Sequence, residues 1–251
     1  MADLQANVMQ RDKWALVTGG SRGLGFEVAR GLAQAGFSLL LVAQDPERLR
    51  QAASNLEEEF PSLTVGVKAV DLADERACSK MIADVLQERE KLDLLILAHG
   101  VMSEKNSRTL RTEYREWRRV LATNLDSVFS LLNGFVPAMV ESREGRAVVF
   151  SACLGRMSGP GNTGGLAPYR VSKAGVNALV RNLSFETGLG KRGFLIDAIC
   201  PGHCQTDMGG AQAPRSAAKG AESALWLALR DFDPAHDRTG LLWEDQESVE
   251  W

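Results

Sequence analysis

Short apolar runs alternate with longer amphipathic segments along nearly the whole 251-residue chain, and this alternation restricts the possible fold most strongly. The apolar residues of the short runs are contiguous, which is typical of parallel strands covered on both faces. The predicted strands are Trp14–Thr18, Ser38–Ala43, Thr64–Val70, Leu92–Ala98, Arg146–Ser151, Phe194–Cys200 and Thr239–Trp243. Because a repeating strand–helix order requires right-handed crossovers, we expect an α/β fold of Rossmann type, a doubly wound parallel seven-stranded sheet in three α/β/α layers.

The segments between these runs have helical spacing. Leu49, Ala52 and Leu56 recur on one helical face, and Asp45-Pro46 is a plausible helix start because an Asx side chain and a first-turn proline suit the free amides there. No linker or internal repeat interrupts the pattern. We expect residues 1–12 to form a flexible leader and 13–251 one domain, with a cofactor half at about 13–150 and a catalytic half at about 151–251.

Composition limits the class of partner. The net charge is −3 with both signs scattered, which argues against nucleic acid as the main ligand. No apolar run approaches the ~18 residues of a membrane span, and the polar first residues do not form a signal peptide. The four cysteines are dispersed, so we predict reduced thiols, no metal site and a cytoplasmic protein.

A glycine-rich turn, Gly19-Gly-Ser-Arg-Gly-Leu-Gly25, follows the first predicted strand and opens a helix. Glycines permit a tight turn and close approach of the backbone to a pyrophosphate, and a helix N-terminus supplies free amides for the phosphates. The context predicts dinucleotide binding.

Tyr169 and Lys173 are four residues apart in a later amphipathic segment, so they share one helix face. A phenol titrates near ~10 and is a poor proton donor or acceptor at neutral pH. A neighbouring ammonium favours the phenolate, so we expect Lys173 to lower the pKa of Tyr169.

The spacing Thr-Gly-x-x-x-Gly-x-Gly at 18–25, together with Tyr-x-x-x-Lys at 169–173, resembles the short-chain dehydrogenase/reductase family in its single-domain form. The resemblance covers about residues 13 to 243. It includes Asp71-Leu72, Ala98-His99-Gly100 where relatives have Asn-Ala-Gly, Asn124, and Pro201-Gly202 with Thr206. The run from Tyr169 to Met208 looks most like the carbonyl-reductase branch.

The resemblance implies a set of cofactor-binding residues around a nicotinamide dinucleotide. They are Gly19, Ser21, Arg22, Gly23, Leu24, Gly25, Gln44, Asp71, Leu72, Ala98, His99, Gly100, Tyr169, Lys173, Pro201, Gly202 and Thr206. NAD enzymes place an acidic residue at the end of the second strand, where this chain has Ala43, and Arg22 is placed to meet a 2′-phosphate. We therefore expect NADP(H), with NAD(H) as an alternative through Asp45. Gln44 stands where many relatives carry a second arginine, which predicts a weakened phosphate site.

The resemblance also implies catalytic roles. Tyr169 is the general acid, Lys173 holds the ribose hydroxyls, and Asn124 anchors a water that relays protons to Lys173. Relatives carry a second serine after the fifth strand that polarises the substrate carbonyl, but this chain has Ala152 there. Losing a comparable donor costs ~10²–10³ in rate. Ser151 after a one-residue shift is one candidate replacement, and Ser158 or Thr163 is another.

Two functions remain open from the sequence. The first is an NAD(P)-dependent oxidoreductase of the type EC 1.1.1.-, which transfers hydride between the cofactor and a small-molecule carbonyl or secondary alcohol. The second is a dinucleotide-binding protein with weak or no turnover, acting as a sensor or interaction partner. Relatives are commonly oligomers through the helices holding Asn124 and Tyr169, so a homodimer or homotetramer is expected.

Other polar residues have simpler interpretations. His99 is expected to be a cofactor-floor residue, with a proton shuttle as the alternative, and His203 is a candidate for the substrate pocket. Cys153 is expected to be a buried small hydrophobe. The basic stretch from Lys105 to Arg119 is interleaved with acidic residues, which favours a solvated helix face with internal ion pairs.

Overall fold

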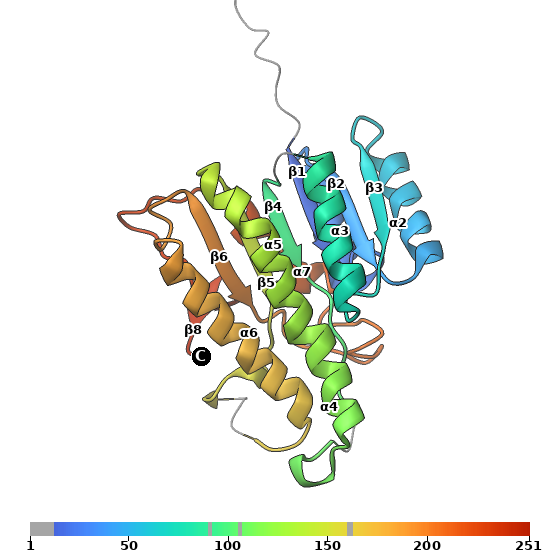
Figure 1. The fold of residues 1–251 in the computed structure, drawn as a ribbon, viewed down its shortest axis with the longest axis vertical. Helices are drawn as coiled ribbons and strands as arrows, with labels where there is room; N and C mark the ends of the chain where they lie inside the picture. The colour runs from blue at the N-terminus through green and yellow to red at the C-terminus, as the bar shows by residue number, and fades with distance from the viewer. Residues whose placement is uncertain (1–12, 90–91, 105–106, 160–162) are drawn as a thin grey trace, which may run out of the picture.

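A computed structural model describes residues 13–89, 92–104, 107–159 and 163–251 of the chain. The predicted leader, 1–12, lies outside the described residues. Figure 1 shows a central twisted sheet with helices on both faces. The three-layer α/β/α prediction is confirmed.

The sheet contains eight strands in the order β3-β2-β1-β4-β5-β6-β7-β8. Their bounds are β1 Trp14–Thr18, β2 Ser38–Ala43, β3 Val65–Ala69, β4 Leu94–Leu97, β5 Gly145–Phe150, β6 Phe194–Ile199, β7 Leu242–Glu244 and β8 Glu247–Val249. The first seven are parallel and correspond to the seven predicted runs, whereas β8 pairs antiparallel with β7. The predicted count of seven is therefore corrected to eight. The short polar strand β8 has no contiguous apolar run, so the pattern used for the others could not detect it.

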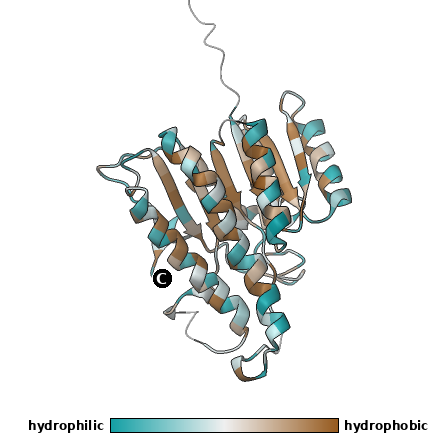
Figure 2. Ribbon diagram, in the orientation of Figure 1, coloured by the Kyte–Doolittle hydropathy of each residue, from teal (hydrophilic) through white to brown (hydrophobic). Residues whose placement is uncertain are grey.

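The helices divide into two layers. Their bounds are α1 Gly23–Gln34, α2 Pro46–Glu59, α3 Glu75–Glu88, α4 Tyr114–Leu121, α5 Ser127–Glu141, α6 Ala167–Glu186 and α7 Ala217–Leu229. Residues of α3, α5 and α6 pack on one face of the sheet in a core that includes Met81, Leu131 and Val176. Residues of α1, α2 and α7 pack on the other face. In Figure 2 the strands between these layers are the most hydrophobic part of the ribbon, as burial on both faces requires.

A side-chain cap begins α2 as the sequence predicts, and a similar cap begins α3. The Asp45 carboxylate accepts hydrogen bonds from the amides of Glu47 and Arg48, and Asp74 does the same for Arg76 and Ala77. The cap at Asp45 holds its carboxylate at the start of α2. Among the described helices none has the length and apolar character needed to cross a bilayer.

The order of β1 and β4 determines where a ligand can bind. The chain runs from β1 outward to β2 and β3 and then returns to β4 on the other side of β1. The helices that follow β1 and β4 therefore diverge, and in such sheets a crevice opens beyond the carboxyl ends of these strands. The glycine turn follows β1, and Ala98-His99-Gly100 follows β4, so both predicted segments reach this edge.

Candidate active site

The glycine turn lies against the end of β4 with little free space. Gly19 has a φ of +67°, and a Cβ added to it would lie 3.1 Å from the Ala98 carbonyl oxygen. A Cβ at Gly25 would lie 2.3 Å from the carbonyl oxygen of Gly19. Helix α1 begins at Gly23 without a side-chain cap, so its first amides keep their hydrogen-bonding capacity. This arrangement fits the pyrophosphate of a dinucleotide.

A cluster of charged residues lies beside this turn, where a cofactor's adenosine ribose is expected. Arg22 forms an ion pair with Asp207, and Arg48 lies 3.6 Å from the same carboxylate. The Gln44 side chain donates a hydrogen bond of 3.1 Å to Asp71. The sequence interpretation missed Arg48 and Asp207. Arg48 lies in the first turn of α2, only four residues after Gln44. This short separation along the sequence could have indicated that Arg48 lies near the expected phosphate site.

The segment after β6 closes the other side of the crevice. Thr206 contacts the glycine turn, because a Cβ added to Gly23 would lie 3.2 Å from the Thr206 methyl group. The Pro201 carbonyl accepts a hydrogen bond from the Cys204 thiol at 3.2 Å, and Gly202 has a φ of +73°. His203 is exposed and its Nε2 lies 2.8 Å from the Gly209 carbonyl oxygen, which closes a small loop. Its predicted place in the substrate pocket stays a prediction.

Asn124 holds three segments together beneath the crevice. It lies in a π-helical turn, Ala122–Asp126, between α4 and α5, and is fully buried. Its Oδ1 accepts a hydrogen bond from the Val101 amide at 2.8 Å. Its Nδ2 donates to the Val101 carbonyl at 2.9 Å and to the Ser172 hydroxyl at 3.1 Å. A π-turn inserted in a helix is a frequent feature of functional sites, and this one directs Asn124 toward α6.

Tyr169 and Lys173 lie on the first turns of α6 and are both buried. The Lys173 ammonium lies 5.9 Å from the centre of the Tyr169 ring and donates a hydrogen bond of 2.7 Å to the Phe150 carbonyl. A Cβ added to Gly100 would lie 3.6 Å from Lys173 Nζ and 3.2 Å from Asn124 Oδ1. The structure thus brings three of the four predicted catalytic residues together at the carboxyl edge of the sheet.

Burial changes the proton affinity of this pair in opposite directions. It raises the pKa of the Tyr169 phenol, and the nearby Cys200 and Cys153 raise it further. It lowers the pKa of Lys173 to about 8. The predicted lowering of the Tyr169 pKa is therefore wrong for the protein alone, because desolvation of the buried phenol dominates its shift. In the protein alone the Tyr169 phenol is therefore protonated at neutral pH and is a weaker acid than a free phenol.

Ser151 is not brought into this group. Its hydroxyl is buried and donates hydrogen bonds to Asn177 Oδ1 and, at 3.5 Å, to the Lys173 carbonyl. The other two candidates are also engaged elsewhere. Ser158 donates to the Trp251 carbonyl at 3.5 Å, and Thr163 Oγ1 accepts from Arg170 at 2.6 Å. Within the described residues, no hydrogen bond links any of these three hydroxyls to Tyr169.

The His99 side chain links β1 to α5 at the base of the crevice. Its Nδ1 lies 2.6 Å from Thr18 Oγ1 in β1, and its Nε2 lies 2.7 Å from Ser127 Oγ in α5. Because Ser127 donates its own proton to the Thr123 carbonyl at 2.7 Å, it accepts from Nε2, and Nδ1 accepts from Thr18. Burial and the charge of Lys173 lower the pKa of His99 to about 3, so the imidazole is neutral. These contacts favour the floor residue over the proton shuttle.

The basic stretch has one of the predicted internal ion pairs, Arg119 with Glu116 at 2.7 Å, whereas Arg118 bonds Asp126, beyond the stretch, at 3.1 Å. Lys105 lies outside the described residues. Arg119 also donates to the Met102 carbonyl at 2.8 Å, which ties α4 to the segment that follows β4.

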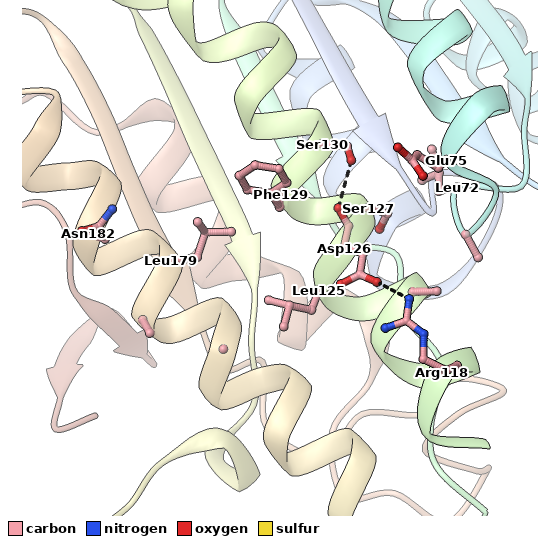
Figure 3. Close-up of a pocket in the computed structure, with 14 residues that line it drawn as sticks. Leu72, Glu75, Arg118, Leu125, Asp126, Ser127, Phe129, Ser130, Leu179 and Asn182 are labelled. Carbon is pink, nitrogen blue, oxygen red and sulfur yellow. Dashed lines mark hydrogen bonds and ion pairs between the residues drawn. The ribbon is translucent and has the colours of Figure 1, made fainter. Parts of the chain in front are cut away.

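A groove lies where α4, α5 and α6 meet, and Leu72 and Ser127 are among the residues that line it. It has a volume of about 770 Å³ and is lined by Leu125, Phe129 and Leu179 together with Arg118, Asp126 and Asn182. Figure 3 shows these side chains converging from the three helices, with Asp126 bonded to Arg118. The chemistry-bearing residues Tyr169 and Lys173 do not line it.

Comparison with known proteins decides the family. The family model described as short chain dehydrogenase matches residues 13–217. The chain belongs to the short chain dehydrogenase family. The 3-oxoacyl-acyl-carrier-protein reductase FabG of Staphylococcus aureus is 32% identical over 202 residues, covering 80% of this chain and 78% of its own. FabG of Chlamydia trachomatis serovar D is 29% identical over 197 residues, covering 78% and 76%.

Solved structures agree with this assignment. A metagenomic short-chain oxidoreductase in complex with NADP is 26% identical with a TM-score of 0.73, covering 86% of this chain and 90% of its own. A variant of actinorhodin polyketide ketoreductase with NADPH is 25% identical with a TM-score of 0.76, covering 87% and 91%. A short chain dehydrogenase from Salmonella enterica has a TM-score of 0.82 at 23% identity and covers 94% and 96%, which supports the fold. This oxidoreductase family was the one identified from the motifs, although the comparisons do not specify the carbonyl-reductase branch.

Proposed function

We propose that the protein is an NADP(H)-dependent reductase that converts a ketone to a secondary alcohol, with Tyr169 as the general acid. The observation that carries the proposal is the convergence of Tyr169, Lys173 and Asn124 beside the glycine turn at the strand switch point. The bound cofactor would supply hydride to the carbonyl carbon. The Tyr169 phenol, which is protonated at neutral pH, would donate its proton to the carbonyl oxygen. The Lys173 ammonium, near Gly100, is positioned for the ribose hydroxyls.

The names of the relatives indicate which ketone to test first. Two FabG reductases act, by name, on 3-oxoacyl groups carried by a protein, and a structural relative is a polyketide ketoreductase. We propose a 3-oxoacyl thioester as the substrate class. NADP(H) is the proposed cofactor because Arg22 and Arg48 lie beside Gln44 and β2 ends in Ala43 without an acidic side chain.

The decisive experiment is NADPH oxidation by the purified protein with a short 3-oxoacyl thioester, compared with simple ketones and aldehydes. Replacing Tyr169 with Phe removes the proton donor while keeping the ring, so kcat should fall by about 10²-fold or more. NADPH binding, read by cofactor fluorescence, should remain. A Tyr169→Phe protein that retains full kcat would overturn the assigned role.

A second candidate function, dinucleotide binding with weak turnover, is supported by Ala152 and by the engagement of Ser151 within the core. It is tested by Ala152→Ser, which places a hydroxyl where relatives carry their carbonyl-polarising donor. We expect kcat to rise by about 10-fold to 10³-fold in the variant if the chain is a reductase limited by this missing donor. An unchanged, near-zero kcat in Ala152→Ser with intact NADPH binding favours the binding protein.

Ser151→Ala should leave kcat unchanged, and a large loss would restore Ser151 as a catalytic group.

A homo-oligomer is also part of the proposal. Phe129 of α5, which lines the groove, is 55% exposed, and α6 also carries the exposed side chains of Val171 and Phe185. The groove in Figure 3 lies between these helices, the same helices through which an oligomer is expected. We propose that a second copy of the chain covers this surface.

A further inference from the structure

Two cysteines meet at the edge of the crevice. Cys153 begins a short 3₁₀ turn, Cys153–Gly155, just after β5, and Cys200 follows β6 directly before Pro201. Strands β5 and β6 are neighbours, and the Ser151 amide bonds the Ile199 carbonyl at 2.7 Å. Just beyond the ends of the two strands, the Cys153 amide donates a hydrogen bond of 3.1 Å to Cys200 Sγ. Both thiols are free.

The environments of the two sulfurs differ in a way that suits sequential chemistry. Cys153 is partly exposed, whereas Cys200 is only 2% exposed. The neighbouring Cys200 thiol lowers the pKa of Cys153 to about 6, whereas burial and Glu244 act in the opposite direction and Arg156 adds a small lowering. Cys200 is held protonated, and its Sγ donates to Glu244 Oε1 at 3.6 Å. The two positions therefore suit different roles: the partly exposed Cys153 can react first, and the buried Cys200 can then react with the oxidised Cys153.

We propose that Cys153 and Cys200 form a peroxide-sensitive thiol pair beside Tyr169, in which Cys153 is oxidised first and Cys200 resolves it to a disulfide. The Cys153 thiolate attacks a hydroperoxide, so the O–O bond breaks, sulfur is oxidised to the sulfenic acid, and hydroxide or alkoxide leaves. Cys200 then loses its proton to the adjacent Glu244 carboxylate and attacks the sulfenic sulfur, expelling hydroxide. Overall, two thiols and one hydrogen peroxide give one disulfide and two waters.

The disulfide should slow the reductase. A disulfide requires an S–S distance of about 2 Å, so we expect the turn at Cys153–Gly155 to shift toward β6 when the bond forms. That turn has no spare room, because a Cβ added to Gly155 would lie 2.7 Å from the backbone carbon of Lys173. The displacement is therefore transmitted to the helix turn that holds Tyr169 and Lys173. This effect on turnover rests on the proposed function, whereas the disulfide does not.

The experiment treats the reduced full-length protein with stoichiometric hydrogen peroxide and measures intact mass and linked peptides. We expect a loss of about 2 Da per chain and one linked peptide pair joining Cys153 to Cys200. In Cys200→Ser the product should instead be a sulfenic acid at Cys153, a gain of about 16 Da that a dimedone probe captures. Glu244→Gln should slow the second step. Cys78→Ser is the matched control, because its thiol is buried on α3, and it should behave as wild type.

Activity is measured on the same samples. Turnover of the oxidised wild type should fall on the order of 10-fold to 10²-fold and return with dithiothreitol. Equal oxidation of all four cysteines, or a disulfide that still forms in Cys153→Ser, would overturn the thiol pair. A disulfide with unchanged turnover would overturn only its regulatory effect, and absent turnover in the reduced protein would count against the proposed function instead.

Discussion

At the scale of single residues, burial sets the protonation states of the site more than neighbouring charge does. Tyr169 and Lys173 were expected to act on each other directly, but their spacing on α6 leaves the ammonium 5.9 Å from the ring centre. Desolvation penalises the charged form of each group, so the phenol and the amine both move toward neutrality. In the protein alone Tyr169 is therefore protonated but is a weaker acid than a free phenol.

The charged cluster beside the glycine turn leads to a prediction on cofactor choice. Arg22 and Arg48 converge on one carboxylate, Asp207, which occupies a position suited to an anion. Replacing Arg22 with Ala removes a cation from the proposed 2′-phosphate site, so the Kd for NADPH should rise about 10-fold while that for NADH changes little. Titration of cofactor fluorescence measures both constants.

Arg30 supplies the control for this prediction. It lies on α1, just after the turn that holds Arg22, and is similarly exposed, but it bonds Glu59 instead. Arg30→Ala should leave the ratio of the two Kd values unchanged. If Arg22→Ala weakens NADH and NADPH equally, the arginine contributes to general binding and not to discrimination.

The sequence alone could not show where the Ser151 side chain points or which residues His99 contacts. Ser151 follows β5, and its hydroxyl turns toward Asn177 of α6, a partner 26 positions away. His99 bonds Thr18 and Ser127, which come from two other elements. Both outcomes depend on which helix packs against which strand end. Local propensity and spacing carry no information on that choice, whereas the motif Tyr-x-x-x-Lys lies within one helix and was predictable.

At the scale of elements, the hydrogen bonds of His99 join the ends of β1 and β4 to α5. They should make the stability of the protein sensitive to acid. The folded pKa is about 3, and the unfolded value is 6.5. Between these values the unfolded chain binds the proton more tightly, so the neutral imidazole contributes stability above pH 6.5 that is lost as the pH falls toward 3. The loss from His99 between pH 7 and 5 should be about 1 to 2 kcal/mol.

The measurement is urea unfolding of the wild type and His99→Ala at both pH values. At pH 7 the variant should be less stable by about 1–3 kcal/mol, because Thr18 and Ser127 each lose a partner. The variant should also lose less stability than the wild type on going to pH 5. His236, an exposed histidine paired with Asp233, is the control, and His236→Ala should keep the wild-type pH dependence. Parallel pH curves for the wild type and His99→Ala would contradict the neutral imidazole.

The elements themselves were well predicted where burial on both faces produces contiguous apolar runs. Strands β1 and β2 begin and end at the predicted residues, whereas β4 is shorter than Leu92–Ala98 because its ends leave the ladder. The last strand pair was the least predictable. Strand β8 is only three residues long with two exposed positions, and its pairing depends on the turn at Asp245 and Gln246, both with positive φ.

At the scale of the whole molecule, the exposed surface over α4, α5 and α6 predicts the oligomeric state. The groove of about 770 Å³ is apolar at Leu125, Phe129 and Leu179 and is rimmed by Arg118 and Asp126, a distribution typical of an interface core and its edge. The sheet's other face is covered by α1, α2 and α7. We therefore expect a second copy on the groove, and the protein in solution should have a mass at least twice the 27.3 kDa of one chain.

Phe129→Glu tests this assembly by placing a charge on the surface that a second copy would cover. Burying an unpaired carboxylate is costly, so light scattering should show the variant shifting toward 27.3 kDa at concentrations where the wild type is associated. Leu229→Glu is the matched control, because Leu229 is 43% exposed at the end of α7 on the opposite face. A wild type that stays at the mass of one chain, or a control that dissociates equally, would contradict an interface over the groove. Dissociation of Phe129→Glu with retained NADPH binding would separate assembly from the cofactor crevice, as expected from the separate locations of groove and glycine turn.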